Sequence, residues 1–439
     1  MLSRICLSLT LLVAMPIWSQ VESSATSSAP SSEDAMRTPP SVSGEFYPTA
    51  TASETRSNSL RAGMYFGTAY DDNVLGAESL TPVADIAYTI KPTISFDQVK
   101  SRLRQTFTYS PGFTLYQHTS SRNEADQNAS ANLEYRLSPH ISVSVRDFLR
   151  KSTNVFNEPY AGVSGSTQPP TAIFVAPFAN QLSNSASGET SYQFSSKAMI
   201  GGSAVSTIVN YLDPAQASGV SNSNSRGGSA FWNRRLTSTQ NIGVTYQYSS
   251  MAASTQDINS ETHTQTIYSF YTLYLKPSFS LSVSGGPQHF DVTESGLPTA
   301  ASWAPAVTAS VAWQASRANV AVSYSRTVDG AGGLLGAFKS TTANASARWQ
   351  MARAWTVGAT ANYGIQKNVL SALLSPTNGG HTISGILTIQ HPIGERLTAE
   401  CGYERLHQSY TGLGAISENP DSNREYISIS YQLARSLGR

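Results

Sequence analysis

The stretch AWTVGATANYGIQ, from Ala354 to Gln366, decides the fold. Starting at Trp355, every second residue up to Ile365 is apolar, and the residues between them are Thr, Gly, Asn or Gln. Because side chains of a β-strand point alternately to its two faces, this period of two predicts a strand with one apolar and one polar face. What has to be decided is whether the apolar face meets a protein core or lipid.

The same alternation recurs along the chain from about residue 60, where the sequence shows no convincing helix. It is clear in ISVSVRD (141–147), NIGVTYQYS (241–249), FSLSVSGG (279–286) and EYISISYQL (425–433). Short connections alternate with long ones that are rich in Gly, Ser, Asn and Asp. This arrangement predicts eighteen strands, with sixteen as an alternative because the sixth, seventh and eighth alternate poorly. The expected strands cover about 60–70, 83–98, 101–117, 128–137, 141–151, 185–195, 198–211, 225–236, 239–250, 262–275, 278–291, 303–314, 318–328, 338–350, 354–367, 381–391, 396–409 and 423–434.

Several features favour lipid over a soluble core. Only 13% of the residues are charged, against about 25% in soluble domains, and the polar face consists mostly of Ser, Thr, Asn, Gln and Gly. Eighteen strands are too many for two packed sheets, which would curl or split, and lipid requires a closed barrel because it cannot satisfy bare backbone groups. Aromatic residues, which favour the lipid–water boundary, crowd the expected strand ends: Tyr246, Tyr248, Tyr268, Tyr271, Tyr274, Trp303, Trp313, Trp349, Trp355, Tyr363, Tyr403 and Tyr431.

The resulting prediction is an all-β protein, a transmembrane antiparallel up-and-down β-barrel with periplasmic termini and long outer loops. A soluble β protein is the alternative fold. On the favoured fold, Trp355 to Ile365 face lipid and Thr356 to Gln366 face the lumen. Pro92 and Pro111 interrupt strands, so bulges or irregular pairing are expected there.

Three segments are expected. Residues 1–20 resemble a secretory signal peptide, with Arg4 before a short apolar run. Residues 21–59 are rich in Ser, Thr and Pro and are expected to be a disordered periplasmic segment. Residues 60–439 form the barrel. Removal of the signal peptide leaves Cys401 as the lone cysteine, on the expected lipid face.

A family resemblance appears at GMYFGTAYDDNVLGA (63–77) and continues through AYTIKPTISF (87–96). A first strand that runs into a Tyr-Asp-Asp-Asn-Val turn, followed by a P-x-I-x-F strand, resembles the β-barrel porin 2-like family. The resemblance is clearest over roughly 60–150. It implies an outer-membrane location and a barrel shape, and it supplies no substrate.

The candidate pore-lining residues are charged side chains on the polar face. Four arginines on the third to fifth strands would form a basic wall, and Glu134 shares their face. Two glutamates on the seventeenth strand also point inward, and the longest loop, expected at 152–184, contains Glu158. Charge rings of this kind set ion selectivity; alternatively, the same side chains pair to fill and stabilise the interior. The full set is Arg102, Arg104, Glu134, Arg136, Arg146, Glu158, Glu400 and Glu404.

Enzymatic and metal-dependent readings find little support. His-x-Ser occurs three times, as at His118 and Ser120, which is near chance in so Ser-rich a chain. Asp71-Asp72-Asn73 lacks the spacing of a calcium loop and fits a turn better. We therefore expect no enzyme activity, no catalytic residue, no metal and no cofactor. The net charge of +1 gives no reason to expect nucleic acid, which usually selects a basic patch.

The favoured functional hypothesis is an outer-membrane porin-like barrel of a Gram-negative bacterium that passes small hydrophilic solutes by diffusion. One alternative is an export portal for an anionic exopolysaccharide, guided by the inward arginines. The other is a closed barrel that acts as a scaffold or adhesin through its loops. The expected partners are outer-membrane lipid, lipopolysaccharide and the barrel assembly machinery, although the chain ends in ARSLGR without the usual terminal aromatic residue.

Overall fold

The computed structural model describes residues 58–75, 82–152, 180–212, 221–254, 259–276, 278–296, 298–330, 336–352, 354–369, 379–411 and 421–437. All of them belong to one compact unit, Met36–Arg439. The expected signal peptide and nearly all of the Ser-, Thr- and Pro-rich segment lie outside the described residues. Ser59, at the end of that segment, already belongs to the first strand.

The described residues form eighteen antiparallel strands and one short 3₁₀ helix. The strands are β1 (Ser59–Asp71), β2 (Asp85–Val99), β3 (Leu103–Tyr116), β4 (Glu124–Ser138), β5 (Ile141–Ser152), β6 (Gln181–Ser195), β7 (Ala198–Tyr211), β8 (Asn222–Thr237), β9 (Gln240–Ser254), β10 (Asn259–Lys276), β11 (Phe279–Glu294), β12 (Ala300–Gln314), β13 (Ala318–Gly330), β14 (Ala337–Gln350), β15 (Thr356–Asn368), β16 (Gly379–Ile393), β17 (Leu397–Thr411) and β18 (Asp421–Ser436), and the helix is η3 (Ser120–Arg122).

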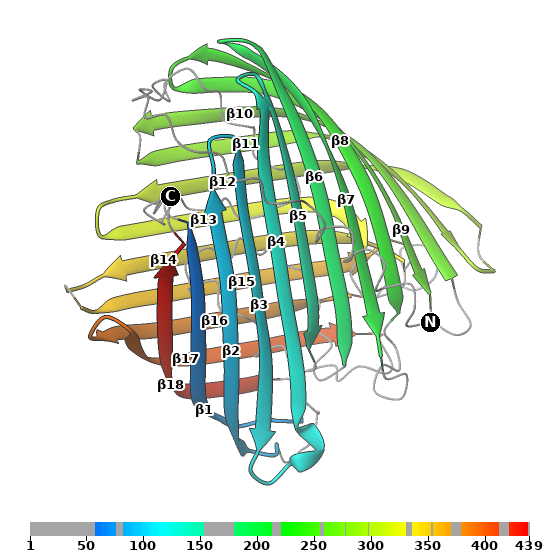
Figure 1. Ribbon diagram of the computed structural model, residues 1–439. Coiled ribbons are helices and arrows are strands. Elements are labelled where there is room, and N and C mark those ends of the chain that lie inside the picture. Colours follow the sequence, from blue (N-terminus) through cyan, green and yellow to red (C-terminus); the bar gives the residue numbers. More distant parts are fainter. Residues whose placement is uncertain are drawn as a thin grey trace, which may run out of the picture. The chain divides into compact units, whose positions relative to one another are not determined.

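Each strand pairs with its neighbours in sequence, and β1 pairs with both β2 and β18, which closes the barrel. Figure 1 shows this junction, where blue β1 lies beside red β18. The predicted count of eighteen is confirmed, and the alternative of sixteen is wrong. The largest local differences are three stretches of four residues that were expected in loops and belong to strands: Glu124–Gln127 in β4, Gln181–Asn184 in β6 and Met251–Ser254 in β9.

The pleat places apolar residues outside and polar residues inside. In β15 and its preceding turn, Trp355 and Tyr363 are 43% and 42% exposed, whereas Gln366 is 1% exposed. In β18, Ile427 is 63% exposed and its neighbour Ser428 only 3%. The exterior and interior faces predicted for the opening stretch are thus confirmed. This distribution is the inverse of a soluble protein, where large apolar side chains are buried.

Two expected boundary aromatic residues of β10, Tyr268 and Tyr274, have the interior phase, since Tyr274 pairs with Ser280 two residues beyond the buried pair of Thr272 and Ser282. Tyr268 lies on the interior face of β10 and is 1% exposed, so it is part of the packed interior. The prediction failed because aromatic content was counted without its phase: Ile267, the next residue, is the one that faces outward.

The two strand prolines interrupt pairing without shifting its register. Pro92 and Pro111 lie opposite each other, and the pairing of β2 with β3 resumes in the same register after Ile90↔Phe113, at Ile94↔Tyr109. Neither proline has an N–H to donate, so placing them together confines the missing ladder bonds to one spot. Ser110 Oγ donates to the Pro92 carbonyl oxygen over 3.3 Å.

The Tyr-Asp-Asp-Asn-Val segment fastens the first strand to the last. Ser422 Oγ donates to Asp71 Oδ1 over 2.8 Å. The Asn423 backbone N–H and side-chain Nδ2 donate to the two carboxylate oxygens of Asp72, each over 2.7 Å. Asn73 Nδ2 donates to the Asp421 carbonyl oxygen over 3.0 Å. The turn role expected for these residues is therefore extended by a closure role at the β1–β18 seam.

We expect Asp72→Ala to weaken this closure. The change removes two charge-assisted hydrogen bonds, each of which contributes about 1.5–3 kcal/mol. The temperature at which the folded band is lost on a semi-native gel should fall by several degrees. For Asp72→Asn, which keeps one acceptor oxygen, this temperature should fall less. An equal fall for both variants would contradict the closure role of Asp72.

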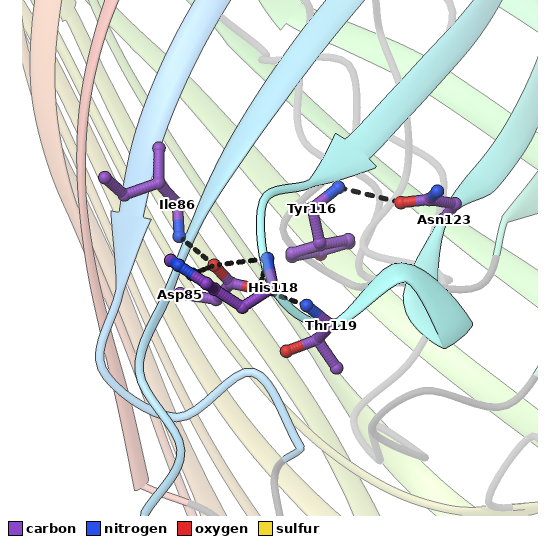
Figure 2. Close-up of polar contacts among 6 residues, drawn as sticks. All are labelled: Asp85, Ile86, Tyr116, His118, Thr119 and Asn123. Atoms are coloured by element: carbon purple, nitrogen blue, oxygen red, sulfur yellow. Dashed lines mark hydrogen bonds and ion pairs between the residues drawn. The ribbon is translucent and has the colours of Figure 1, made fainter.

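A second anchor holds the β3–β4 connection, which contains η3 (Figure 2). The buried Asp85 carboxylate accepts the backbone N–H groups of Ile86, His118 and Thr119, at 2.7 to 3.2 Å. His118 Nδ1 lies 3.0 Å from Asp85 Oδ1. Asn123 Oδ1 accepts the Tyr116 N–H over 2.8 Å. Asp85, the first residue of β2, therefore fixes the β3–β4 connection beside it.

Candidate functional site in the barrel interior

The interior face is lined by hydroxyl groups that bond across neighbouring strands. Thr89 and Thr114 are 3.2 Å apart, and Ser325 and Thr342 are 2.7 Å apart. Similar pairs join Ser142 to Ser191, Ser203 to Ser229, and Thr272 to Ser282. Cross-strand hydroxyl pairs of this kind stabilise a sheet, and they explain why the polar face has few charged residues.

The arginines expected as a basic wall gather at one rim. Arg104 on β3 is the register partner of Glu134 on β4, and Arg146 on β5 is the partner of Asn132. All alternate with exterior residues such as Phe107, Tyr135 and Val145, so they lie on the interior face.

Arg102 lies in the short turn before β3, where its carbonyl oxygen accepts the Arg136 N–H over 2.7 Å. Arg102, Arg104, Arg136 and Arg146 are all exposed. We call these four residues and Arg61 the arginine mouth, because they lie near one another on the interior face at the short-turn end.

Arg61 was missed by the sequence reasoning. It lies on the interior face of β1, and its Nη2 is 3.5 Å from Asp97 Oδ2 on β2. The signal was its phase, since Arg61 lies on the same face of β1 as Gly63, Gly67 and Asp71. Tyr65 and Ala69 on the same face obscured it. This pair extends the arginine mouth to five neighbouring strands, β1 to β5.

Glu400 is fixed by two hydrogen bonds from flanking strands. Tyr426 Oη donates to Glu400 Oε1 over 2.6 Å, and Gln390 Nε2 donates to Oε2 over 2.7 Å. The Tyr426 ring lies across Gly402, where an added Cβ would be 2.5 Å from the ring. Glycine at this position therefore lets the tyrosine reach the carboxylate.

Glu404 is 2% exposed, and it sits in a row of charged interior residues. Arg424 on β18 is the register partner of both Glu404 on β17 and Asp71 on β1. A buried charge is costly without a partner, so this row fits the structural role for Glu404. Glu158, predicted in the longest loop, lies outside the described residues.

The interior is packed in the half near the long connections. Phe290, Val292, Ala304, Val328 and Ala337 form a buried apolar cluster there. Gln288 holds the end of β13 to it, because its Nε2 donates to the Val328 carbonyl and its Oε1 accepts the Val328 N–H. The interior therefore changes from exposed arginines at one end to buried side chains at the other. Sequence alternation gave no signal of this cluster.

We expect Gly402→Val to release Glu400. The added side chain would displace the Tyr426 ring and break the 2.6 Å hydrogen bond. Loss of one bond to a charged group corresponds to about 1.5–3 kcal/mol. The folded band of Gly402→Val should be lost at a lower temperature than that of Tyr426→Phe. Both variants lose the same hydrogen bond, but only Gly402→Val adds a steric clash. A Gly402→Val barrel as stable as wild type would contradict this account.

Among the described residues, no group of His, Cys, Asp and Glu could hold a metal ion. His118 is used by the Asp85 anchor, and no hydrogen bond joins it to a serine within the described residues. No described helix is long and apolar enough to cross a membrane, a criterion that does not bear on crossing by strands. Cys401 is exposed, on the exterior face as predicted.

No protein-family model matches the chain, and no curated protein sequence matches it. The resemblance to the β-barrel porin 2-like family thus stays unconfirmed.

Solved structures with a similar fold include three outer-membrane β-barrels. OpdQ of Pseudomonas aeruginosa is 12% identical, with a TM-score of 0.41 over 86% of this chain and 99% of that one. OpdO of the same species is 11% identical, with a TM-score of 0.43 over 86% and 97%. The FrpB iron transporter of Neisseria meningitidis is 11% identical, with a TM-score of 0.43 over 84% of this chain and 66% of its own. Because these sequence identities and TM-scores are low, the functional conclusions rest on the residues of this chain.

Proposed function

We propose that this protein is a porin-like barrel of a Gram-negative outer membrane that passes small hydrophilic solutes by diffusion. The observation that carries the proposal is the inverted distribution of side chains around a closed barrel. Large apolar residues cover the exterior, and hydroxyl groups with exposed arginines line the interior. An apolar exterior suits lipid, and a polar interior suits water and hydrophilic solutes.

Single-channel recording in a planar bilayer tests this proposal. The refolded protein without its expected signal peptide should give discrete conductance steps. Folding is checked independently, because a folded barrel migrates differently on a gel before and after boiling. A folded, heat-modifiable barrel that never conducts would rule out the diffusion porin.

An export portal for an anionic polysaccharide is the second candidate. It is favoured by the position of the arginine mouth at the short-turn end, which we place in the periplasm by analogy with bacterial barrels. A polyanion leaving the periplasm would meet these cations first. Deletion of the gene should then abolish the secreted acidic polymer, and unchanged polymer would count against the portal.

A closed scaffold is favoured by a different observation, the packed interior near the long connections. It predicts a folded barrel without conductance in the same bilayer experiment. The recording therefore separates the porin from the scaffold directly.

A further inference from the structure

The pairing of strands around the barrel is incomplete between β12 and β13. Pairing between these two strands ends at Val307↔Arg326, although β12 begins at Ala300. Beyond that point β12 still pairs with β11 up to Ala300, and β13 still pairs with β14 up to Gly330. We call the stretch where no described pairing joins the two strands, residues 300–306 of β12 and 327–330 of β13, the seam.

A proline explains where the pairing stops. Hydrogen-bonded pairs alternate along antiparallel strands, so the one after Val307↔Arg326 would join position 305 to Val328. Pro305 has no N–H to donate there. Gln288 of β11 takes its place, because its Nε2 donates to the Val328 carbonyl oxygen over 2.8 Å and its Oε1 accepts the Val328 N–H over 2.7 Å. The end of β13 is thus held to β11 instead of β12.

The seam lies in the outer part of the apolar layer. Trp303 and Trp313 are both exposed on the exterior of β12, and they are ten positions apart. Since a strand crosses the apolar layer in about 9–11 residues, the two rings mark its boundaries, and Trp303 marks the one on the long-loop side. Pro305 is two positions inside that boundary. Lipid cannot satisfy bare backbone groups on this edge of β12, so the seam is a weak point of the wall.

An apolar cluster lies behind the seam. Its buried members come from four strands and are Phe290, Val292, Ala304, Val328 and Ala337, each at most 7% exposed. Val328 has the same phase as exterior Tyr324, but it packs against interior side chains because β13 turns inward. The cluster is therefore enclosed between two overlapping parts of the wall, and the seam is its edge toward lipid.

A cation without a partner lies at the end of this cluster. Arg326, two residues before Val328, is the last residue of β13 that pairs with β12. Its Nε is buried and has no hydrogen-bond partner among the described residues. A buried donor without an acceptor is costly, so an anion beside Arg326 would be favourable. An apolar cluster next to such a cation suits a molecule with an alkyl chain and an anionic head.

We propose that the seam binds a long-chain fatty carboxylate that enters from the membrane. The carboxylate accepts hydrogen bonds from Arg326, and the alkyl chain packs against the apolar cluster. The chain enters when the end of β13 moves away from β11, which breaks the two bonds between Gln288 and Val328. A cluster of five buried residues suits one chain, whereas a membrane lipid carries two or more. This inference rests on the membrane location in the proposed function and does not require conductance.

Photolabelling of the full barrel in phosphatidylcholine nanodiscs tests the site. The probe is palmitate with a diazirine in its alkyl chain, and the labelled residues are mapped by mass spectrometry. Contact with lipid alone labels exterior residues of β11, such as Val283. Phe290 and Val292 have the interior phase, so we expect them to be labelled because the chain enters the seam. Their labelling should saturate, and unlabelled palmitate should compete with it.

Pro305→Val should close the seam. The variant restores the backbone N–H opposite Val328, and valine favours strands, so the pairing of β12 with β13 can continue. Labelling of Phe290 and Val292 should fall about tenfold or more, while the folded band survives heating as in the wild type. Pro92→Val is the matched control, because it makes the same change at an exterior position of β2. It should leave the labelling unchanged.

Arg326→Gln tests the recognition of the carboxylate. It should raise the palmitate concentration that half-saturates labelling about tenfold or more, the loss expected for one hydrogen bond to a charged group. For the same probe with a hydroxyl in place of the carboxylate, the half-saturating concentration should not change. This difference separates loss of the cation from a folding defect.

Three results would overturn the proposal. They are labelling confined to exterior residues, equal labelling of Pro305→Val and wild type, and competition by lipid A at a lower concentration than by palmitate, which would assign the seam to an outer-leaflet lipid. The bilayer recording is an independent readout. A barrel labelled at Phe290 that never conducts would retain this site and reject the porin, and a conducting barrel labelled only on its exterior would do the reverse.

Discussion

Ala361→Arg should prevent most of the protein from folding into a bilayer, whereas Thr360→Arg, one residue earlier, should fold well. Ala361 is exposed on the exterior face of β15, six positions from Trp355 and thus near the middle of the apolar layer. Arginine on the lipid face at mid-depth costs about 2–4 kcal/mol. Thr360 faces the interior, where the guanidinium can remain hydrated. Folding yield into lipid vesicles, read as the heat-modifiable band, measures the difference.

Comparing the two variants controls for the β-propensity and the charge of arginine, because the same residue is introduced at adjacent positions of one strand. A soluble β protein predicts a different result for Ala361→Arg. Ala361→Arg would be harmless on a solvated exterior, and folding would not require lipid or detergent. Equal yields for the two variants would therefore reject both the phase assignment and the membrane exterior.

Period-two alternation was sufficient to predict the fold. It gave all eighteen strands, because most strands separate an apolar exterior from a polar interior over most of their length. The boundaries were less certain where polar side chains occur on both faces. The clearest example is EADQ at the start of β4, where Asp126 is buried in the interior and Gln127 faces outward. A polar run of this kind looks like a loop in the sequence.

The candidate site was predicted in part. Alternation gave the interior phase of Arg104, Glu134, Arg136 and Arg146, and neighbouring strands gave their proximity. It could not show that they gather at one rim, because that depends on strand register and turn position. Glu404 and Glu400 share one phase on β17, yet one is buried in a charged row and the other is held by Tyr426. Such differences arise from residues far apart in sequence.

The apolar interior cluster shows a different limit. Phe290 and Val292 occupy interior positions of β11, where alternation predicts polar residues. They are buried because β13 turns inward beyond Arg326, as its pairing with β12 ends at Val307↔Arg326. The bonds from Gln288 to Val328 then replace the missing ladder partner. The departure of β13 from the regular barrel is thus accompanied by two hydrogen bonds to an interior glutamine, which no periodicity identifies.

Reversing two charges in the arginine mouth should reverse the ion preference of the pore. Arg104→Glu with Arg146→Glu changes the local charge by four units at exposed interior positions. Two unit charges about 4 Å apart in water interact by about 1 kcal/mol, so an anion-to-cation permeability ratio should fall about tenfold or more. The zero-current potential across a salt gradient at about 0.1 M measures this ratio.

Salt and position together separate a pore effect from a surface effect. The Debye length falls from about 10 Å at 0.1 M to about 3 Å at 1 M, so the shift should shrink strongly at high salt. Arg234→Glu carries the same type of reversal at the short-turn end, but on the exterior face of β8. Because the barrel wall and lipid separate it from the permeating ions, it should leave the ratio unchanged. A ratio that shifts equally in both variants would mean that ions do not pass the arginine mouth, and the five arginines would then be a structural rim.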